Sequence, residues 1–250
     1  MKQVLVVGGG GGLGTALVKQ LLDDGYKVFV AGQTKPIDER VSDFYRIELT
    51  NVDWPSLYCT IENKNVGPID AIVFVAGSAV FGKTTLIPLP QAREIFELNF
   101  WACATAARTA AEYWETQKTP GKFVAVLSIA ARRAVPFEAY YSASKAAAAR
   151  FLECLQLEYA DKKIEFLCAF PGTLKTGFRR RAHWYGLPAP SIDEGADVPA
   201  TAKAVIKLLE GKRKTRVIGW RERTVDLADR VVPGLYERLL LRRRVRRLLK

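Results

Sequence analysis

Residues 4–14, VLVVGGGGGLG, join a short apolar run directly to a cluster of glycines. The segment that follows, 13–22, has apolar residues at helical spacing. Glycine suits a turn from strand to helix because it adopts positive φ and lets a phosphate approach the backbone, while the helix N-terminus carries partial positive charge. A flexible loop is the alternative, but the position of the turn favours a pyrophosphate site. The residues expected there are Gly8, Gly12, Leu13 and Gly14.

Strand-like and helix-like segments alternate along most of the chain. Apolar runs predict strands and 3–4 spacing predicts helices. The strands are expected at 2–7, 27–31, 69–76, 122–128 and 164–170, and the helices at 13–22, 91–114 and 142–160. Such alternation predicts an α/β fold, a single Rossmann-type doubly wound parallel sheet with helices on both faces. Ligands of such a sheet bind beyond the carboxyl ends of its strands.

The composition is that of an ordinary globular protein, with 250 residues, 49% of them hydrophobic and 26% charged. No low-complexity linker interrupts the pattern, so we expect one catalytic domain over 1–233. The four cysteines have no paired spacing, which predicts buried thiols in a reducing compartment and no metal site. The longest uncharged apolar run, 71–81, is too short to span a bilayer. We therefore expect a cytoplasmic protein.

The net charge of +12 is concentrated near the C-terminus, where seven basic residues and no acid follow from Arg238 onward. Residues 234–250 have leucines broadly on one side of a helix and arginines elsewhere. Two interpretations stay open: a basic amphipathic helix on an anionic membrane, an acidic partner or another subunit, and a solvated helix packed on its own domain. Nucleic-acid binding is not expected, because no known binding module or interleaved aromatics accompany the charge.

Residues 126–145, VLSIAARRAVPFEAYYSASK, contain a tyrosine and a lysine one helical turn apart. Reduction of a ketone requires a proton donor that also stabilises the developing negative charge on oxygen. Tyr141 and Lys145 share a helix face, and we expect the positive charge of the lysine to lower the pKa of the tyrosine. Tyr140 would need its partner at Ser144, which is uncharged. The sequence therefore favours Tyr141 as the acid, although this spacing also occurs by chance.

The glycine spacing and the YxxxK pattern resemble the compact branch of the short-chain dehydrogenase/reductase family. The resemblance covers roughly the first 220 residues. It implies that Ser128, thirteen residues before Tyr141, donates a hydrogen bond to the substrate oxygen. It also implies that the main chain of Asn99 holds a water that relays protons to Lys145. Without a catalytic role, Ser128 would be a turn serine at the end of a strand, and Asn99 would be an asparagine at a helix kink. The resemblance to the family instead implies a catalytic tetrad of Ser128, Tyr141, Lys145 and Asn99.

The cofactor expectations also rest on this resemblance. An NAD-preferring member carries an acid at the end of the second strand, where this chain has Gly32 followed by Gln33 and Lys35. We therefore expect NADP(H) to be preferred over NAD(H). The resemblance assigns cofactor contacts to Gln33, Lys35, Glu48, Leu49, Ala76, Gly77, Tyr141, Lys145, Pro171, Gly172 and Thr176. The chain departs from the family at Val7, where threonine is usual, and at Phe74 and Val75, which replace two asparagines.

The expected activity is NADPH-dependent reduction of a carbonyl compound, or the reverse oxidation of an alcohol. A substrate lid is expected at about 177–196. Its aromatic residues and three arginines could hold a ligand with an apolar body and an anionic group. The alternative interpretation is a run of arginines that face solvent and bind no ligand. The alternative function is a catalytically silent nicotinamide-binding regulator or scaffold. A third reading keeps the enzyme and anchors it through 234–250 near a lipid-like substrate. Family members are usually dimers or tetramers.

Overall fold

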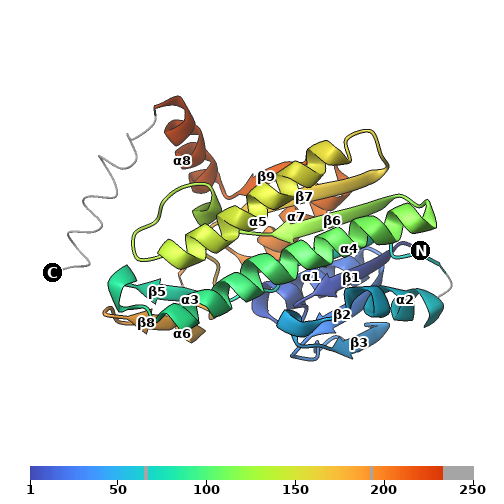
Figure 1. The fold of residues 1–250 in the computed structure, drawn as a ribbon, viewed down its shortest axis with the longest axis horizontal. Coiled ribbons are helices and arrows are strands. Elements are labelled where there is room, and N and C mark those ends of the chain that lie inside the picture. Colours follow the sequence, from blue (N-terminus) through green and yellow to red (C-terminus); the bar gives the residue numbers. More distant parts are fainter. Residues whose placement is uncertain (65–66, 192–193, 233–250) are drawn as a thin grey trace.

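The computed structural model describes residues 1–64, 67–191 and 194–232. Its centre is a parallel sheet of seven strands in the order β3-β2-β1-β4-β6-β7-β9 (Figure 1). The strands are β1 (Gln3–Val7), β2 (Lys27–Gly32), β3 (Asp43–Arg46), β4 (Ala71–Phe74), β6 (Gly121–Val126), β7 (Ile164–Pro171) and β9 (Thr215–Ile218). This arrangement confirms the doubly wound α/β fold predicted from the alternating pattern.

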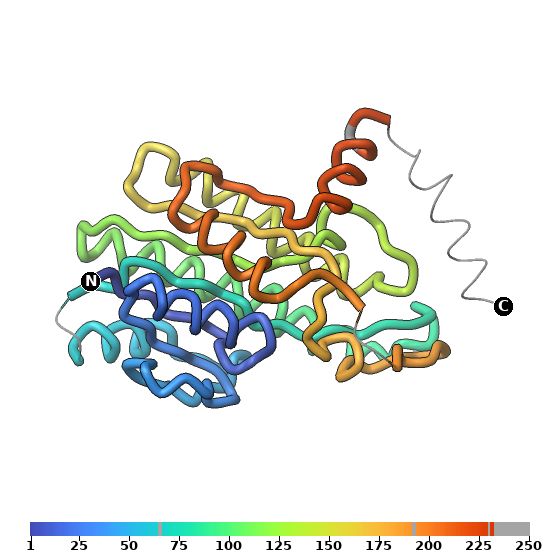
Figure 2. The backbone as a smooth tube through the Cα atoms, turned by 180° about the vertical axis from the view of Figure 1, so that it is seen from behind, coloured from blue at the N-terminus to red at the C-terminus, as the bar shows by residue number. Residues whose placement is uncertain are grey.

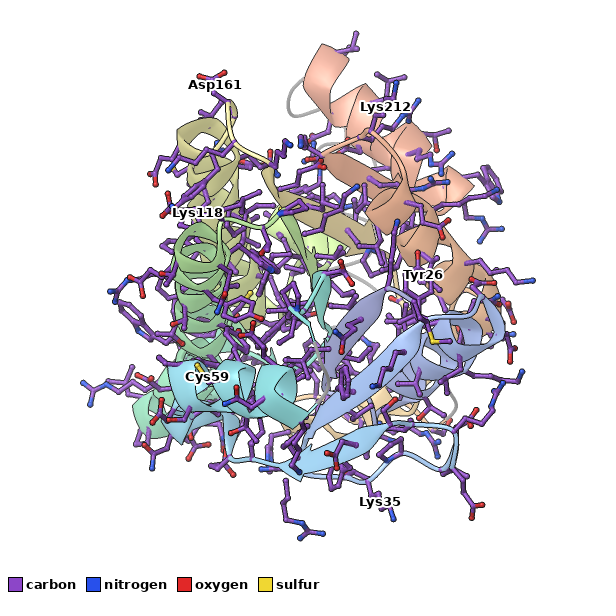
Figure 3. All side chains as sticks on the ribbon, turned by 90° about the vertical axis from the view of Figure 1, so that its right-hand side faces the viewer. Tyr26, Lys35, Cys59, Lys118, Asp161 and Lys212 are labelled. Atoms are coloured by element: carbon purple, nitrogen blue, oxygen red, sulfur yellow. The ribbon has the colours of Figure 1, made fainter. Side chains whose placement is uncertain are left out.

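Helices cover both faces of the sheet. One face carries α2 (Trp54–Lys64), α4 (Ala102–Gln117) and α5 (Ala139–Glu158), and the other carries α1 (Gly12–Asp23) and α7 (Val198–Glu210) (Figures 2 and 3). Side chains of a strand alternate between the two faces. In β1, Leu5 and Val7 pack on the first layer of helices, whereas Val4 and Val6 pack on the second. A strand buried on both sides is therefore continuously apolar.

The helix expected over 91–114 is interrupted in its middle. It consists of α3 (Leu89–Phe96), a π-helical turn (Glu97–Trp101) and α4. At the end of the turn the Ala102 amide donates to the carbonyl of Glu97, five residues back. A π-helical turn of this kind is frequent at functional sites. The prediction of one regular helix was wrong here, because helical spacing does not reveal a single extra residue in a turn.

Several elements were not predicted from the sequence. They include β3, α2, α7 and β9, and a separate two-stranded parallel sheet of β5 (Val80–Gly82) and β8 (His183–Tyr185). A short helix, α6 (Phe178–Arg181), precedes β8 within the expected lid. Helix α8 (Trp220–Val231) follows β9 and projects from the body of the molecule (Figures 1 and 2).

The basic segment 234–250 lies outside the described residues, so the predicted amphipathic helix there stays a prediction. The end of the catalytic domain at residue 233 is likewise a proposal. Within the described ranges, no helix has both the length and the apolar character needed to cross a membrane.

Candidate active site

A cleft of about 1120 Å³ runs along the carboxyl ends of the central strands. Its wall includes the glycine turn after β1, the loops after β2, β4, β6 and β7, and the first turns of α5. All predicted site residues except Lys35 and Asn99 line it. The fold therefore brings segments from the whole length of the chain to one place, as expected for a doubly wound sheet.

Several positions of the glycine turn have no room for a side chain. A Cβ on Gly14 would lie 2.2 Å from the carbonyl oxygen of Gly8, and one on Gly10 would lie 2.2 Å from the carbonyl oxygen of Thr34. Gly8 also has a φ of +90°. Gly11 precedes α1 without any side-chain cap, so the first amides of the helix have no side-chain acceptor from their own cap. These features fit the diphosphate of a dinucleotide, which such a helix N-terminus binds.

The loop after β7 closes over this turn. Pro171 ends β7, and Gly172 and Thr176 follow along the cleft wall. A Cβ on Gly12 would meet the Thr176 side chain at 2.8 Å. The turn after the first strand and the loop after the seventh thus touch each other, and both belong to the predicted cofactor site.

Ser128, Tyr141 and Lys145 lie together at the cleft. Ser128 caps a 3₁₀ turn directly after β6, where its Oγ accepts from the amide of Ala130 at 3.1 Å. Tyr141 and Lys145 follow in the first turns of α5 and are buried. The structure therefore brings together three of the four residues that the resemblance assigns to catalysis.

The pKa values of the pair depart from the expected direction. Burial raises the pKa of Tyr141 to about 12, against smaller lowering effects of its hydrogen bond with Ser128 and of the Arg179 charge. Burial lowers the pKa of Lys145 to about 8. The sequence predicted that the charge of Lys145 lowers the pKa of Tyr141. In the structure burial dominates and raises that pKa, and the lowering contributions come from Ser128 and Arg179.

Asn99 lies behind the cleft in the π-helical turn and is almost fully buried. Its amide nitrogen donates to the Ser78 carbonyl at 2.9 Å and to Ser144 Oγ at 3.0 Å, and its Oδ1 accepts from the Ser78 amide at 3.0 Å. Ser144 Oγ in turn donates to the carbonyl of Tyr141 at 2.8 Å. The side chain of Asn99 thus links the loop after β4 to the helix that carries Tyr141.

Gly77 explains why this loop approaches so closely. A Cβ at this position would lie 2.8 Å from Lys145 Nζ and 2.9 Å from Asn99 Oδ1. Any side chain at residue 77 would therefore displace the lysine amine or the asparagine amide.

The departures from the family pattern at Phe74 and Val75 are accommodated by packing. The Phe74 ring stacks on Phe123 with 6.3 Å between centroids and contacts Trp54. The amide of Val75 donates to the Val7 carbonyl at 2.9 Å. The Phe74 side chain is therefore held by aromatic packing, and the backbone at Val75 is held by a hydrogen bond to β1.

The adenosine end of the cleft is only partly as predicted. Gly32 ends β2, and Gln33 donates to the Glu48 carboxylate at 2.7 Å. Gln33, Glu48 and Leu49 line the cleft. Lys35 does not, and Figure 3 shows it at the edge of the molecule, pointing outward. The structure therefore brings the glutamine, but not the lysine, to the predicted cofactor site.

Two aromatic side chains, Phe81 and Phe178, line the cleft beside Tyr141. Phe81 in β5 meets the Tyr141 ring edge-on at 5.7 Å and contacts Trp184 of β8 at 4.9 Å. The Arg179 guanidinium lies 4.3 Å from the Phe81 ring centroid and donates to the buried Glu138 carboxylate at 2.7 Å. This ion pair joins α6, in the predicted lid segment, to the residue preceding the helix of Tyr141.

The sequence did not single out Phe81, Glu138 or Ser144 as site residues. Ser144 was visible only as the neighbour of Lys145, and Glu138 only as a charge shortly before the helix. Phe81 carried no signal, since the pairing of β5 with β8 joins segments about 100 residues apart.

A family model described as short chain dehydrogenase matches residues 2–184. The chain belongs to this family. A short-chain dehydrogenase of Burkholderia cenocepacia J2315, solved in complex with NADP, is 26% identical, with a TM-score of 0.78 over 96% of this chain and 99% of that one. The short-chain dehydrogenase model thus extends over most of the described sheet.

Two curated relatives are similar to this chain over most of their length. An uncharacterized oxidoreductase of Myxococcus xanthus is 28% identical over 82% of this chain and 84% of its own length. An NADPH-dependent 3-dehydrocapnine reductase of Ornithobacterium rhinotracheale is 26% identical over 82% and 77%. The chain is therefore an NAD(P)-dependent dehydrogenase/reductase that acts on a small molecule.

Proposed function

We propose that this protein is an NADPH-dependent carbonyl reductase, or the reverse alcohol dehydrogenase, that acts through Ser128, Tyr141, Lys145 and Asn99. The observation that carries the proposal is the meeting of Ser128, Tyr141 and Lys145 at the cleft, beside a glycine turn with no space for a side chain at Gly10 or Gly14. The reduced nicotinamide supplies a hydride to the substrate carbon when bound. The protein then has to bind, orient and protonate the carbonyl oxygen.

Tyr141 donates the proton in this mechanism. Its hydroxyl and that of Ser128 hydrogen-bond to the carbonyl oxygen, and the tyrosine proton moves to that oxygen as negative charge develops there. Lys145, whose pKa is lowered to about 8, loses and regains a proton near neutral pH and can resupply the tyrosine. Asn99 positions this helix through Ser144. The high pKa of Tyr141 keeps it protonated, as the acid of a reduction must be.

The preference for NADPH rests on the end of β2. Gly32 offers no carboxylate to repel a 2′-phosphate, and Gln33 lies beside it in the cleft. The nearby carboxylate of Glu48 is held by Gln33 at 2.7 Å. We expect the preference to be modest, because no arginine stands at Gln33.

The test is ketone-dependent oxidation of NADPH by the wild type and by Tyr141→Phe. The substitution removes the proton donor from the described site, so we expect turnover to fall at least about 10³-fold while the Kd for NADPH stays nearly unchanged. Tyr140→Phe, one residue away in the same helix, is the matched control and should retain activity. A Tyr141→Phe variant with most of its activity would refute the mechanism.

A catalytically silent nicotinamide-binding protein is the second candidate function. It is favoured only by the replacement of the usual asparagines by Phe74 and Val75. Tight NADPH binding without oxidation by any of a broad set of ketones would support it.

We further propose that the protein is cytoplasmic and assembles into a dimer or tetramer. Contact of 234–250 with an anionic membrane is also a proposal.

A further inference from the structure

The outer face of helix α8 carries a stripe of exposed apolar side chains. Trp220, Leu227 and Val231 are 72%, 63% and 70% exposed. At 3.6 residues per turn, these three positions fall within about 40° of one another around the helix axis. Figures 1 and 2 show the helix standing out from the body of the protein. An apolar stripe on a projecting helix indicates an interaction surface.

Two arginines flank this stripe. Arg221 and Arg223 are both exposed, and the helical geometry places them on opposite sides of the line through Trp220, Leu227 and Val231. The guanidinium of Arg221 lies 5.2 Å from the Trp220 ring centroid. The exposed positions of α8 therefore combine apolar and basic side chains.

The acids of α8 lie on the opposite side of the helix, at Glu222, Asp226 and Asp229, and all three are half-buried. Asp226 accepts from Arg132 at 2.6 Å, next to the 3₁₀ turn that Ser128 caps. Glu222 lies against Gly172 and lines the cleft. The acidic face thus joins the helix to the active-site wall, and the outer face is left basic and apolar.

We propose that the outer face of α8 lies on an anionic lipid surface. An interfacial helix has this composition, with tryptophan and aliphatic side chains entering the headgroup region and arginines at the phosphates. The charge pattern disfavours a second copy of the chain, since a two-fold contact through this face would bring the arginines of both copies together. The seven basic residues from Arg238 onward add charge of the same sign.

This contact would hold the edge of the active-site cleft at the lipid surface, because Glu222 lines the cleft from the inner side of the same helix. The inference goes beyond the proposed reductase activity and does not depend on it. Membrane binding and NADPH binding are measured separately, so either one can fail alone.

The test is co-sedimentation of the full chain with phosphatidylcholine vesicles, with and without phosphatidylglycerol. We expect binding only to the anionic vesicles. Leu227→Glu places an acid in the centre of the stripe and should weaken binding at least about tenfold. Ile37→Glu, at an 85% exposed apolar residue in the loop after β2, is the control and should bind like the wild type.

A second variant tests the charges and leaves the stripe intact. Replacing Arg221 and Arg223 by glutamine should weaken binding about fivefold for each arginine. Full binding by Leu227→Glu, or no binding of the wild type to anionic vesicles, would overturn the proposal. So would a loss of oligomer mass in Leu227→Glu by light scattering, which would identify the face as a contact between copies. An unchanged circular dichroism spectrum and thermal midpoint show that the variant is folded.

Discussion

The two walls of the cleft are built differently. The glycine-turn wall is largely backbone, and at Gly10 and Gly14 the backbone leaves no space for a Cβ atom. The other wall consists of side chains, including Phe81, Phe178 and Arg179, and Phe81 comes from β5, which pairs with the distant β8. The difference teaches that the predicted cofactor site depends on residue spacing within one short segment, whereas the proposed substrate site depends on contacts between distant segments.

The largest effect is expected when one methyl group is added to the glycine-turn wall, which tests whether that wall depends on close backbone approach. Gly14→Ala places a Cβ 2.2 Å from the Gly8 carbonyl oxygen, so the turn has to shift away from its phosphate-binding geometry. We expect the Kd for NADPH to rise at least about a hundredfold, which corresponds to about 2.7 kcal/mol. Fluorescence titration measures this change.

Gly11→Ala is the matched control. The only nearby atom is the Gly8 carbonyl oxygen at 3.6 Å, an ordinary contact distance, so binding should stay close to that of the wild type. Equal effects of the two alanines would contradict the view that close backbone approach defines this wall.

The side-chain wall can be tested at Glu138. Glu138→Gln removes the charge that pairs with Arg179, whose side chain is 25% exposed. We expect the free energy of unfolding to fall by about 1–2 kcal/mol. The KM for ketone substrates should rise, because Arg179 fixes the lid, while the Kd for NADPH should not change.

Glu112→Gln removes the acid of an exposed ion pair with Arg108 and serves as the control. Chemical denaturation should show a change below about 0.5 kcal/mol. If both glutamines have the same effect on stability and KM, the lid contact has no special role.

A smaller effect is expected from the buried amine of Lys145. Its pKa in the folded protein is lowered from 10.5 to about 8, so the stability it contributes is complete above pH 10.5 and is lost as the pH falls through 8. Between pH 7 and pH 9 the wild type should therefore gain about 1 kcal/mol relative to Lys145→Met, which does not titrate.

Denaturation of both proteins at the two pH values measures this difference, since the other titrating groups are common to them. A gap that stays constant between pH 7 and pH 9 would show that the lysine keeps its charge in the folded protein.

Much of the fold could be predicted from the sequence because its central strands are continuously apolar and its turns contain glycine. The edge strand β3 could not, since it has only two apolar residues between Asp43 and Arg46 and none of its residues is fully buried. The order and spacing of Ser128, Tyr141 and Lys145 are local, so the sequence located them. The pKa values of Tyr141 and Lys145 depend on burial by distant segments, so the sequence predicted the wrong direction for the pKa of Tyr141.

The lid gave the weakest prediction. Its arginines were visible in the sequence, but the partner of Arg179 is Glu138, which lies 41 residues earlier in the chain. The prediction that Lys35 contacts the cofactor rested on its position after β2. In the structure Lys35 does not line the cleft, and its side chain points outward (Figure 3).

Parallel fluorescence titration of the wild-type protein with NADPH and NADH tests the central claim most directly. The backbone wall predicts binding of both cofactors, and the absence of a carboxylate at Gly32 predicts that NADPH binds more tightly. Equal affinities would contradict the proposed preference. Binding of neither cofactor would contradict the proposed function as a whole, because the glycine turn would then be only an architectural feature of the sheet.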